Sequence, residues 1–225
     1  MNTLRIACCL LPAGLAAFGL VVACSEPPPE TRLLVLDGIE IKLADAMPFV
    51  EYMDTYAPDI GRKTKLMNVL ERYLIPVALA RRQFGAQRAE KLQQAEAMCA
   101  VATNVVELET KSELIAEKVK RDESRATMSP PEAIFLFDPL RTGEVSRPIE
   151  VPQGWYVAGA FDLKPRSLAM DDIVSSLRVG FVTHTAKQWY DYYEEQKRLL
   201  ATKATFVHPD WVTAMPEWIQ PPRQP

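Results

Sequence analysis

The sequence has few residues of the kinds that build metal and phosphate sites. Its 225 residues include only 2 histidines and 9 glycines. A zinc site needs several converging ligands, whereas His184 and His208 stand far apart, with no Cys-x-x-Cys or His-x-x-x-His spacing in the chain. No Gly-x-x-x-x-Gly-Lys or Gly-x-Gly-x-x-Gly string is present to hold a phosphate group. We therefore predict neither a metal ion nor any other cofactor.

Patterns typical of catalysis are also missing. No Gly-x-Ser-x-Gly elbow accompanies the serines, so nucleophilic catalysis has no candidate residue. Two pairs of adjacent acidic residues, Asp171 with Asp172 and Glu194 with Glu195, would diverge around a helix axis. We interpret these carboxylates as solvated helix caps or faces, and the sequence predicts no catalytic residue.

The chain has no excess of basic residues. It carries 26 Lys+Arg against 29 Asp+Glu, which gives a formal net charge of −3 at pH 7. A protein that binds nucleic acid normally concentrates positive charge to meet the phosphates. We therefore expect no nucleic-acid partner.

Cysteine is scarce, with 4 in the whole chain. Cys8 and Cys9 lie in the apolar N-terminal segment, and Cys24 follows that segment directly. The remaining cysteine, Cys99, stands among alanine, methionine and valine, which is typical of a small core residue. Once the N-terminal segment is removed and Cys24 is modified, no internal disulfide can form.

The N-terminal segment has the features of an export signal. Arg5 precedes an apolar run over residues 6–22 that is too short and too weakly flanked for a membrane span. The run ends in Val-Val-Ala before Cys24, which resembles the lipobox of bacterial lipoproteins. In those proteins the cysteine receives diacylglycerol and becomes the new N-terminus. An ordinary cleaved signal followed by an incidental cysteine is the alternative.

The lipobox resemblance also implies a location. It implies that residues 1–23 are a cleaved signal peptide and that Cys24 is lipidated, so that a lipid anchor holds the mature protein on the bacterial cell envelope. Ser25 rather than aspartate follows the cysteine, which favours the periplasmic face of the outer membrane. Three consecutive prolines favour an extended backbone in residues 24–31, which we interpret as a Pro-rich tether.

Hydrophobic spacing predicts several helices and two hairpins in the 202 residues that remain after the signal, enough for one domain or two small ones. The hairpins are expected around the Asp37–Gly38 turn and over 145–161, and a last strand over 204–207. The helices are expected over 44–56, 62–84, 87–124 and 170–201, with a helical turn over 133–140. Pro76 is expected to kink the second helix and Gly85 to end it. The sequence thus predicts an α+β fold with a long helical body and a small antiparallel sheet.

A central string of residues carries a family resemblance. Residues 141–148 read Arg-Thr-Gly-Glu-Val-Ser-Arg-Pro, and residues 154–157 read Gly-Trp-Tyr-Val. Together with the preceding hairpin and long helices, these strings resemble parvulin-type periplasmic foldases. In that family a helical chaperone region adjoins a parvulin domain that carries a Gly-Glu-Val-Ser segment, a proline and a Gly-aromatic-His strand. Residues 33–84 look like the N-terminal chaperone segment of the family, and the last helix and strand look like its closing elements.

The chain also departs from the family pattern. A parvulin has one histidine in its opening strand and a second in the Gly-aromatic-His strand, where this chain has Tyr156 or Val157. His184 is expected inside the C-terminal helix and His208 in the tail. No opening strand is evident between residues 85 and 129, because that region has a helical pattern. The resemblance therefore implies a truncated and degenerate parvulin domain.

These departures bear on catalysis. Turning an Xaa-Pro bond crosses a barrier of about 20 kcal/mol, and an isomerase lowers it by holding the twisted amide in a shaped, poorly hydrated pocket. Because the opening strand and the paired imidazoles are missing from the pattern, we do not expect catalysis. A peptidyl-prolyl cis-trans isomerase with an aberrant parvulin site is the alternative.

The resemblance divides the mature chain into four segments after the tether. They are an N-terminal helical chaperone-like region at 32–128, a vestigial parvulin-like segment at 129–166, a C-terminal helix and strand at 167–207, and a Pro/Trp-rich tail at 208–225. The tail residues Trp211 and Trp218 belong either to a lid packed on the body or to a partner-docking segment.

The resemblance implies a membrane-anchored periplasmic chaperone that binds unfolded or partly folded exported proteins. Large amphipathic rings supply contact area at low entropy cost, so exposed aromatic residues are candidates for the contact with clients. The candidate client-binding residues are Trp155, Tyr156, Tyr190 and Tyr192. Trp155 and Tyr156 are expected on opposite faces of a strand, while Trp189 and Tyr193 are expected in the core. A structural lipoprotein subunit that serves one envelope complex is the further alternative.

Overall fold

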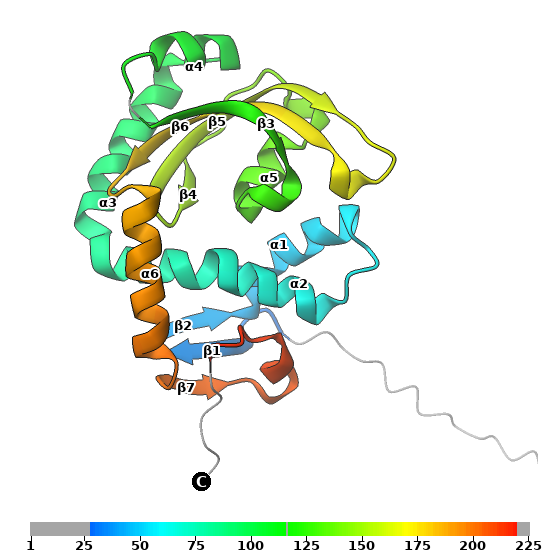
Figure 1. The fold of residues 1–225 in the computed structure, drawn as a ribbon, viewed down its shortest axis with the longest axis vertical. Helices are drawn as coiled ribbons and strands as arrows, with labels where there is room; N and C mark the ends of the chain where they lie inside the picture. The colour runs from blue at the N-terminus through cyan, green and yellow to red at the C-terminus, as the bar shows by residue number, and fades with distance from the viewer. Residues whose placement is uncertain (1–27, 116, 220–225) are drawn as a thin grey trace, which may run out of the picture.

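The computed structural model describes residues 28–115 and 117–219. The fold is α+β, as predicted, and consists of two antiparallel sheets with helices packed around them (Figure 1). The expected signal peptide, Cys24 and the end of the tail lie outside the described residues. None of the helices in the described ranges has the length and apolar character needed to cross a membrane.

The first sheet joins the two ends of the described chain. β1 (Arg32–Leu36) pairs on one side with β2 (Ile39–Lys42) and on the other with β7 (Ala204–Val207). Asp37 has a φ of 48° and Gly38 a φ of 80°, the left-handed values that a two-residue hairpin turn of type I′ requires. The predicted first hairpin and the predicted last strand are both confirmed.

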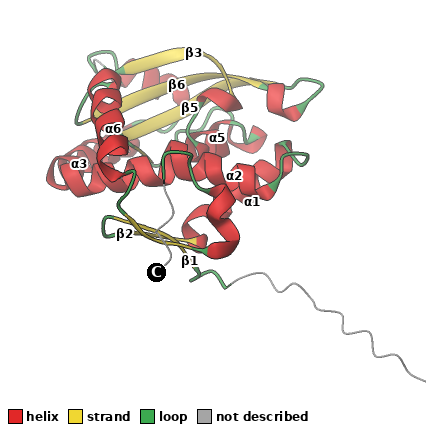
Figure 2. Cartoon of the chain, turned by 60° about the horizontal axis from the view of Figure 1, so that its bottom comes forward, coloured by secondary structure: helices red, strands yellow, loops and turns green. Residues whose placement is uncertain are grey.

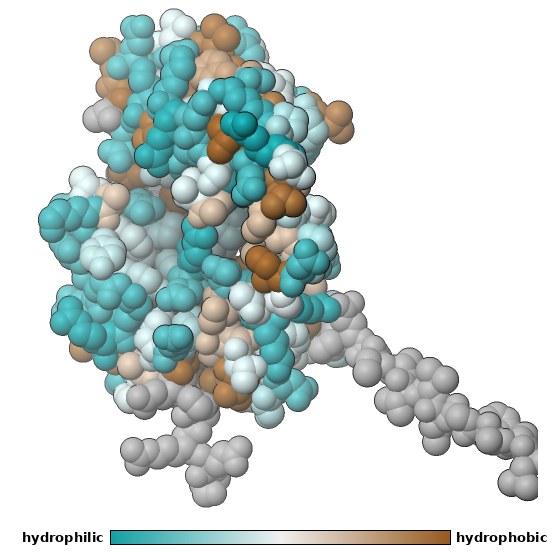
Figure 3. Space-filling model, turned by 45° about the vertical axis from the view of Figure 1, so that its right-hand side comes forward, coloured by the Kyte–Doolittle hydropathy of each residue, from teal (hydrophilic) through white to brown (hydrophobic). Residues whose placement is uncertain are grey.

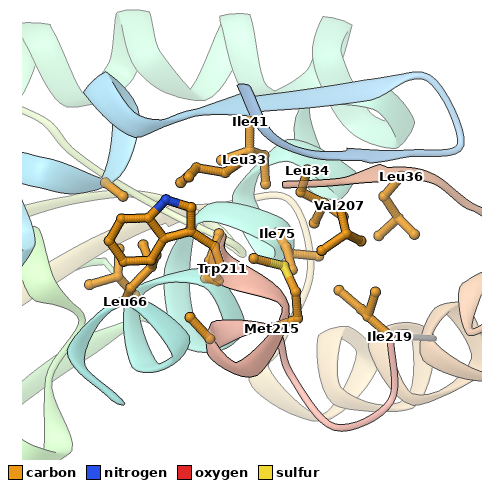
Figure 4. Packing of buried hydrophobic residues seen from close by; sticks show 14 of the residues in the cluster. Leu33, Leu34, Leu36, Ile41, Leu66, Ile75, Val207, Trp211, Met215 and Ile219 are labelled. Carbon is orange, nitrogen blue, oxygen red and sulfur yellow. The ribbon is translucent and has the colours of Figure 1, made fainter. Parts of the chain in front are cut away.

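A layer of helices covers the first sheet. It consists of α1 (Leu43–Tyr56), α2 (Arg62–Val69), a π-helix (Leu70–Leu74), the first turns of α3 (Ile75–Val101) and the end of α6 (Ala186–Leu200). Between this layer and the sheet lies the lower core, the apolar cluster that includes Leu33, Leu34, Leu66, Ile75 and Trp211 (Figure 4). Burial of these side chains away from water supplies the main driving force for this half of the fold.

The tail packs on the lower core. Pro209–Ala214 forms a 3-10 helix, and the ring of Trp211 is buried against the core together with Met215 and Ile219 (Figure 4). Trp218 is partly buried against the same cluster. As far as Ile219, the tail is therefore a packed part of the body.

A π-helix lies directly before Pro76. Proline has no N–H, and the hydrogen bonds of the preceding turn widen, so that the Ile75 N–H donates to the Leu70 carbonyl. The predicted kink at Pro76 takes this form. The wider turn leaves backbone carbonyls free for other partners, one of which is described below.

The long helix does not end at Gly85, and that expectation is wrong. Phe84 departs from helical geometry, with φ −119° and ψ 20°, but α3 resumes and continues to Val101. Beyond the kink, the buried residues Arg88 and Ala95 pack against the second sheet. These tertiary contacts outweigh the low helix propensity of glycine.

The second sheet has four antiparallel strands in the order β3-β6-β5-β4. The strands are β3 (Lys118–Ser124), β4 (Ile149–Val151), β5 (Gly154–Lys164) and β6 (Ile173–Val182). The sheet is curved, with α5 (Pro130–Leu136) under its inner face and α3 and α4 (Val105–Lys111) against its outer face (Figures 1 and 2). The predicted second hairpin is confirmed, and the helical turn expected over 133–140 is observed as α5, which begins earlier, at Pro130, and ends at Leu136.

The first half of the expected C-terminal helix is a strand. Residues 173–182 form β6, and α6 begins only at Ala186. Ile173, Leu177 and Phe181 stand four residues apart, a spacing that places side chains on one face of a helix but also on one face of a strand. Because β6 lies between β3 and β5, pairing on both sides decides in favour of the strand.

The expected helix over 87–124 is wrong in its last part. α3 ends at Val101, Asn104 caps the short α4 by accepting from two backbone N–H groups, and residues 118–124 form β3. β3 is an edge strand, and charged side chains on such a strand prevent unwanted pairing, which explains its Lys- and Glu-rich composition. The expectation that no strand lies between residues 85 and 129 is therefore wrong.

Candidate functional site

Two hollows lie between the inner face of the second sheet and the helices below it. The first, which we call the apolar pocket, has a volume of about 180 Å³. It is lined by Tyr52, Met53, Tyr56, Ala57, Ile60, Asn68, Val69, Arg72, Arg125, Ala126, Met128, Pro130, Ala133 and Met170. Figure 3 shows hydrophobic and hydrophilic residues mixed on the face where the upper and lower parts of the molecule meet.

Arg125 joins the walls of the apolar pocket. Its guanidinium donates to the Asp172 carboxylate (Nη2–Oδ2 2.9 Å), to the Ala169 carbonyl (Nε–O 2.9 Å) and to the Tyr52 hydroxyl. The Tyr52 hydroxyl donates in turn to the Ala133 carbonyl at 2.8 Å. Burial raises the pKa of Tyr52 to about 12, although the positive charge of Arg125 opposes this shift. Tyr52 therefore stays protonated near neutral pH and keeps its place in the wall.

Asp172 is a buried ion-pair partner and not the solvated helix cap that we expected. The residues before it, Ala169–Asp171, form a 3-10 turn. Besides Arg125, the Asp172 carboxylate accepts from the backbone N–H of Arg166 at 2.8 Å. These contacts fix the loop before β6, and the loop carries Met170 into the lining of the apolar pocket.

Arg72, on the π-helix, stands at the rim of the apolar pocket. Its Nη2 donates to the backbone carbonyls of Ala126 (2.7 Å) and Met128 (3.4 Å) across the pocket mouth. The residue is exposed. Over residues 28–115 and 117–219, no carboxylate lies within ion-pair distance of its guanidinium. Arg72 therefore brings an uncompensated positive charge to the apolar pocket, where the charge of Arg125 is already matched by Asp172.

The second hollow, which we call the central hollow, adjoins the apolar pocket. It has a volume of about 360 Å³ and shares Arg72 and Met128 with the first. Its other lining residues are Glu71, Pro76, Thr127, Ser129, Glu132, Val151, Pro152, Gln153, Tyr156, Arg178, Trp189 and Tyr193. The π-helix, α5, α6 and the inner face of the sheet therefore meet around it.

A charge cluster lies at one side of the central hollow. Arg178 on β6 forms ion pairs with Glu123 on β3 and with Glu132 on α5, the latter with Nη1–Oε1 at 3.0 Å. Burial disfavours the charge on Arg178, but the two carboxylates outweigh burial and raise the pKa of its guanidinium. Glu132 also accepts from the Ser129 N–H at 3.0 Å, which caps α5. The cluster therefore ties α5 to the inner face of the sheet.

Tyr156 extends over the inner face of the sheet beside this cluster. A Cβ atom added at Gly180 would come within 2.7 Å of its Cε1, so Gly180 makes room for the ring. Burial raises the pKa of Tyr156 to about 12. Among the described residues its hydroxyl has no hydrogen-bond partner. The hydroxyl is thus free to form a hydrogen bond with a ligand, and it stays protonated at neutral pH.

The π-helix and α6 form another side of the hollow. The Tyr193 hydroxyl donates to the Glu71 carbonyl, an O–O distance of 3.2 Å between residues 122 positions apart. The Trp189 ring stacks on Tyr193, with centroids 5.7 Å apart. Trp189 is buried and Tyr193 partly buried, as expected for core residues, but both also border the central hollow.

The structure separates the four candidate client-binding residues. Tyr156 lines the central hollow, whereas Trp155 lies on the opposite face of the sheet, where its Nε1 donates to the Arg88 carbonyl at 3.0 Å. The opposite orientation of this pair was predicted. Tyr190 is exposed on α6, and Tyr192 packs against the lower core. Three of the four candidates therefore lie away from both hollows.

Other reactive side chains do not contribute to the hollows. Between residues 28 and 219, with 116 left aside, no three His, Cys, Asp or Glu side chains cluster as a metal ion would require. Cys99 is partly buried 3.3 Å from the Ser146 carbonyl, and burial raises the pKa of its thiol. His184 lies in the turn before α6 and not inside the helix as expected, with its ring between Phe84 and Trp189.

Comparisons with protein-family models, with curated proteins and with solved structures found no match. Function must therefore be inferred from the geometry of the two hollows. Their polar groups include tyrosine hydroxyls with raised pKa values, Arg125 and Arg178 in ion pairs with carboxylates, and Arg72, which has no carboxylate partner among the described residues. Such groups suit binding by hydrogen bonds and apolar contact more than proton transfer at neutral pH.

Proposed function

We propose that the protein holds extended segments of unfolded or partly folded exported polypeptides in the two hollows, without catalysis. The observation that carries the proposal is an apolar pocket of about 180 Å³ directly beside a more polar hollow of about 360 Å³. An extended chain presents side chains and unpaired backbone groups in alternation. The apolar side chains of a client would pack in the apolar pocket, and its backbone N–H and C=O groups would form hydrogen bonds in the central hollow.

The lining of the apolar pocket suits side chains of different shapes. Met53, Met128 and Met170 contribute flexible thioethers, which adapt to irregular partners. Tyr52 and Tyr56 contribute large rings with little entropy to lose on binding. A protein that holds many clients needs this kind of adaptable contact surface.

Apart from Glu71 and Arg72, the polar side chains that line the central hollow are neutral or held in ion pairs. The Tyr156 hydroxyl has no partner among the described residues, and Gln153 lines the same hollow. The nearby Arg178 is already paired with Glu123 and Glu132. Contacts of a client backbone with Tyr156 and Gln153 would therefore be neutral hydrogen bonds of modest strength, which allow fast exchange and need no ATP or cofactor.

The lipobox resemblance supports an anchored form of this chaperone. With Cys24 lipidated and residues 24–31 acting as a tether, the protein would meet exported polypeptides at the periplasmic face of the outer membrane. The tether would keep the body close to the membrane without fixing its orientation.

The test measures how the full chain, held in phospholipid nanodiscs, delays aggregation of a chemically denatured model client diluted from urea. We expect a clear delay at several-fold molar excess. Met170→Glu places a carboxylate in the apolar pocket and should remove most of the delay, because its hydration water and an ion pair with Arg72 would occupy the space that an apolar side chain fills. Leu140→Glu is the matched control, since Leu140 is 88% exposed and lines neither hollow.

Two results would contradict the proposal. One is a wild-type chain that fails to delay aggregation. The other is a delay that Met170→Glu and Leu140→Glu leave equally intact, which would move the binding site away from the hollows. Crosslinking in membranes adds a third measurement: one stoichiometric partner would favour a subunit of an envelope complex, and many substoichiometric clients would favour the chaperone.

The four-stranded sheet supports a second candidate, a peptidyl-prolyl isomerase with an aberrant parvulin site. The sheet, α5 and the π-helix enclose the central hollow, and Tyr156 stands in the strand where the family has a histidine. A protease-coupled assay on a proline-limited peptide tests this candidate. Acceleration that is lost in Tyr156→Phe would support it, and no acceleration by the wild-type chain would remove it.

A further inference from the structure

The apolar pocket has an uneven charge. Its lining contains two arginines, Arg72 and Arg125, and no carboxylate. Asp172 outside the lining pairs with Arg125 at 2.9 Å, so that charge is matched. Arg72 only donates to two backbone carbonyls through Nη2, and its other guanidinium nitrogens have no partner in the described ranges. An anionic group is the chemistry that completes this site.

The volume of the pocket limits what it can hold. A cavity of about 150 Å³ in another protein is large enough to bind benzene. The apolar pocket, at about 180 Å³, therefore has room for one apolar side chain of a client, aromatic or aliphatic. Longer segments must continue outside it, past the rim where Arg72 stands.

The geometry of an extended peptide decides which carboxylate can reach Arg72. Successive side chains of an extended chain point to opposite sides, about 3.3 Å apart along the chain. An acidic side chain next to the buried residue would therefore point away from the pocket, and one two residues away points to the same side but starts about 7 Å further along the chain. The α-carboxylate of a C-terminal residue is attached to the same Cα as the side chain in the pocket, and it stays near the rim.

We propose that the apolar pocket receives the C-terminal residue of a client polypeptide. The apolar side chain of that residue fills the pocket, and its α-carboxylate accepts charge-assisted hydrogen bonds from the free guanidinium nitrogens of Arg72. The inference rests on the proposed function and names the part of the client that the pocket binds. It makes the chaperone selective for chains whose last residue is apolar.

Fluorescence anisotropy with labelled octapeptides tests the inference, again with the full chain in nanodiscs. The first peptide consists of Gly, Ser and Thr and ends in Phe with a free carboxylate. The second is the same peptide with a C-terminal amide, and the third ends in Ser with a free carboxylate. A fourth places Phe-Asp internally and has an amidated end. We expect the first peptide to bind at least about tenfold more tightly than each of the others, since a charge-assisted hydrogen bond is being removed or the pocket left empty.

Arg72→Gln should abolish the difference between the free acid and the amide. Arg198→Gln on α6 is the matched control, because Arg198 is exposed and lines neither hollow, and it should keep the difference. If the circular dichroism spectrum shows that Arg72→Gln is unfolded, the comparison of the free acid with the amide on the wild-type chain still tests whether the pocket binds a C-terminal carboxylate. Decanoate as a competitor tests whether a fatty acid is the better occupant.

The outcomes separate this inference from the proposed function. Equal binding of acid and amide, with aggregation still delayed, overturns the C-terminal site and leaves the chaperone. Tighter binding of the internal Phe-Asp peptide, or displacement by decanoate far below the peptide concentration, also overturns it. No delay of client aggregation together with no peptide binding removes both.

Discussion

The lower core and the space between the two sheets are filled in different ways. The lower core consists of apolar side chains from β1, β2, β7 and the surrounding helices, and the buried charge nearest to it is Lys65 on α2. The other buried charged residues all lie in or against the second sheet. They are Arg88, Glu123, Glu132, Asp172 and Arg178.

This difference explains where the hollows lie. Apolar packing has no preferred direction, so side chains can shift until the space is filled. A buried ion pair needs its donor and acceptor at fixed positions, and the surrounding chain cannot close every gap around it. Both hollows adjoin such pairs, the apolar pocket beside Arg125 and the central hollow beside Arg178. The space between the second sheet and the helices therefore keeps room for a ligand beside its buried ion pairs.

Of the substitutions that test this comparison, Arg178→Met should lower the free energy of unfolding the most. Removing the guanidinium leaves the carboxylate of Glu132 buried without a cation and that of Glu123 with Arg121 alone, and we expect a loss of about 3–5 kcal/mol in the free energy of unfolding. Urea denaturation of the full chain measures it. Arg121→Met is the matched control, since Arg121 pairs with the same Glu123 from an exposed position and should cost about 1 kcal/mol or less. Equal losses would show that the buried position of Arg178 has no special importance.

Leu33→Ala tests the apolar side of the comparison. Leu33 is fully buried in the lower core, and its truncation should cost about 3 kcal/mol through lost burial and the cavity left behind. Val35→Ala, on the same strand but only partly buried, should cost clearly less. The same urea titration provides both values. A small loss for Leu33→Ala would mean that the lower core can collapse around the cavity.

Gly159→Ala tests whether the outer face of the second sheet is packed as tightly as the lower core. An added Cβ would lie 2.8 Å from Cγ2 of Val105 and 2.9 Å from the Glu144 carbonyl oxygen. We expect a cost of about 1–3 kcal/mol from overpacking, read from the thermal midpoint. Gly85→Ala is the control, because a Cβ there meets nothing within 4 Å and should stabilise the helix slightly. An unchanged thermal midpoint for Gly159→Ala would mean that both faces of the sheet are loosely packed.

The smallest effect is a pH dependence of the contact between α3 and the β4–β5 hairpin. Burial would raise the pKa of Glu150, but hydrogen bonds from Arg81 and Arg88 outweigh burial and lower it. Stability from this carboxylate is therefore present above its ordinary pKa of about 4.3 and is lost as the pH falls below that value. Glu150→Gln should lower the free energy of unfolding by about 1.5 kcal/mol at pH 7. It should also reduce the fall of the urea midpoint that the wild-type chain shows as the pH drops below about 4.3. An equal fall in the variant would contradict this assignment.

The sequence identified the local elements well where a turn or a breaker acts alone. The Asp37–Gly38 hairpin, the break after Ser129 and the turn before Gly154 all follow from backbone preferences that need no distant partner. Two strands were mistaken for helices. β6 has a hydrophobic spacing of four that fits both structures, and β3 is a charged edge strand whose paired residues on β6 lie 49 to 61 positions away.

The candidate site was only partly visible in the sequence. Trp155 and Tyr156 were predicted on opposite faces of a strand, but the sequence did not show which of them faces the helices; Tyr156 is the one that lines the central hollow. Arg72 and Arg125 were missed, because they meet the same pocket from elements that no local pattern connects. A lone arginine on a helix or in a turn is typical of a solvated surface.

The amino-acid sequence by itself determined the α+β class, the turns and the helices that precede the second sheet, because propensity, capping and hydrophobic period act over a few residues. Only the tertiary structure decided that residues 118–124 and 173–182 are strands and that two hollows lie between the sheets. Strand pairing and buried ion pairs join residues far apart in the chain, and their free energy exists only once the layers have come together.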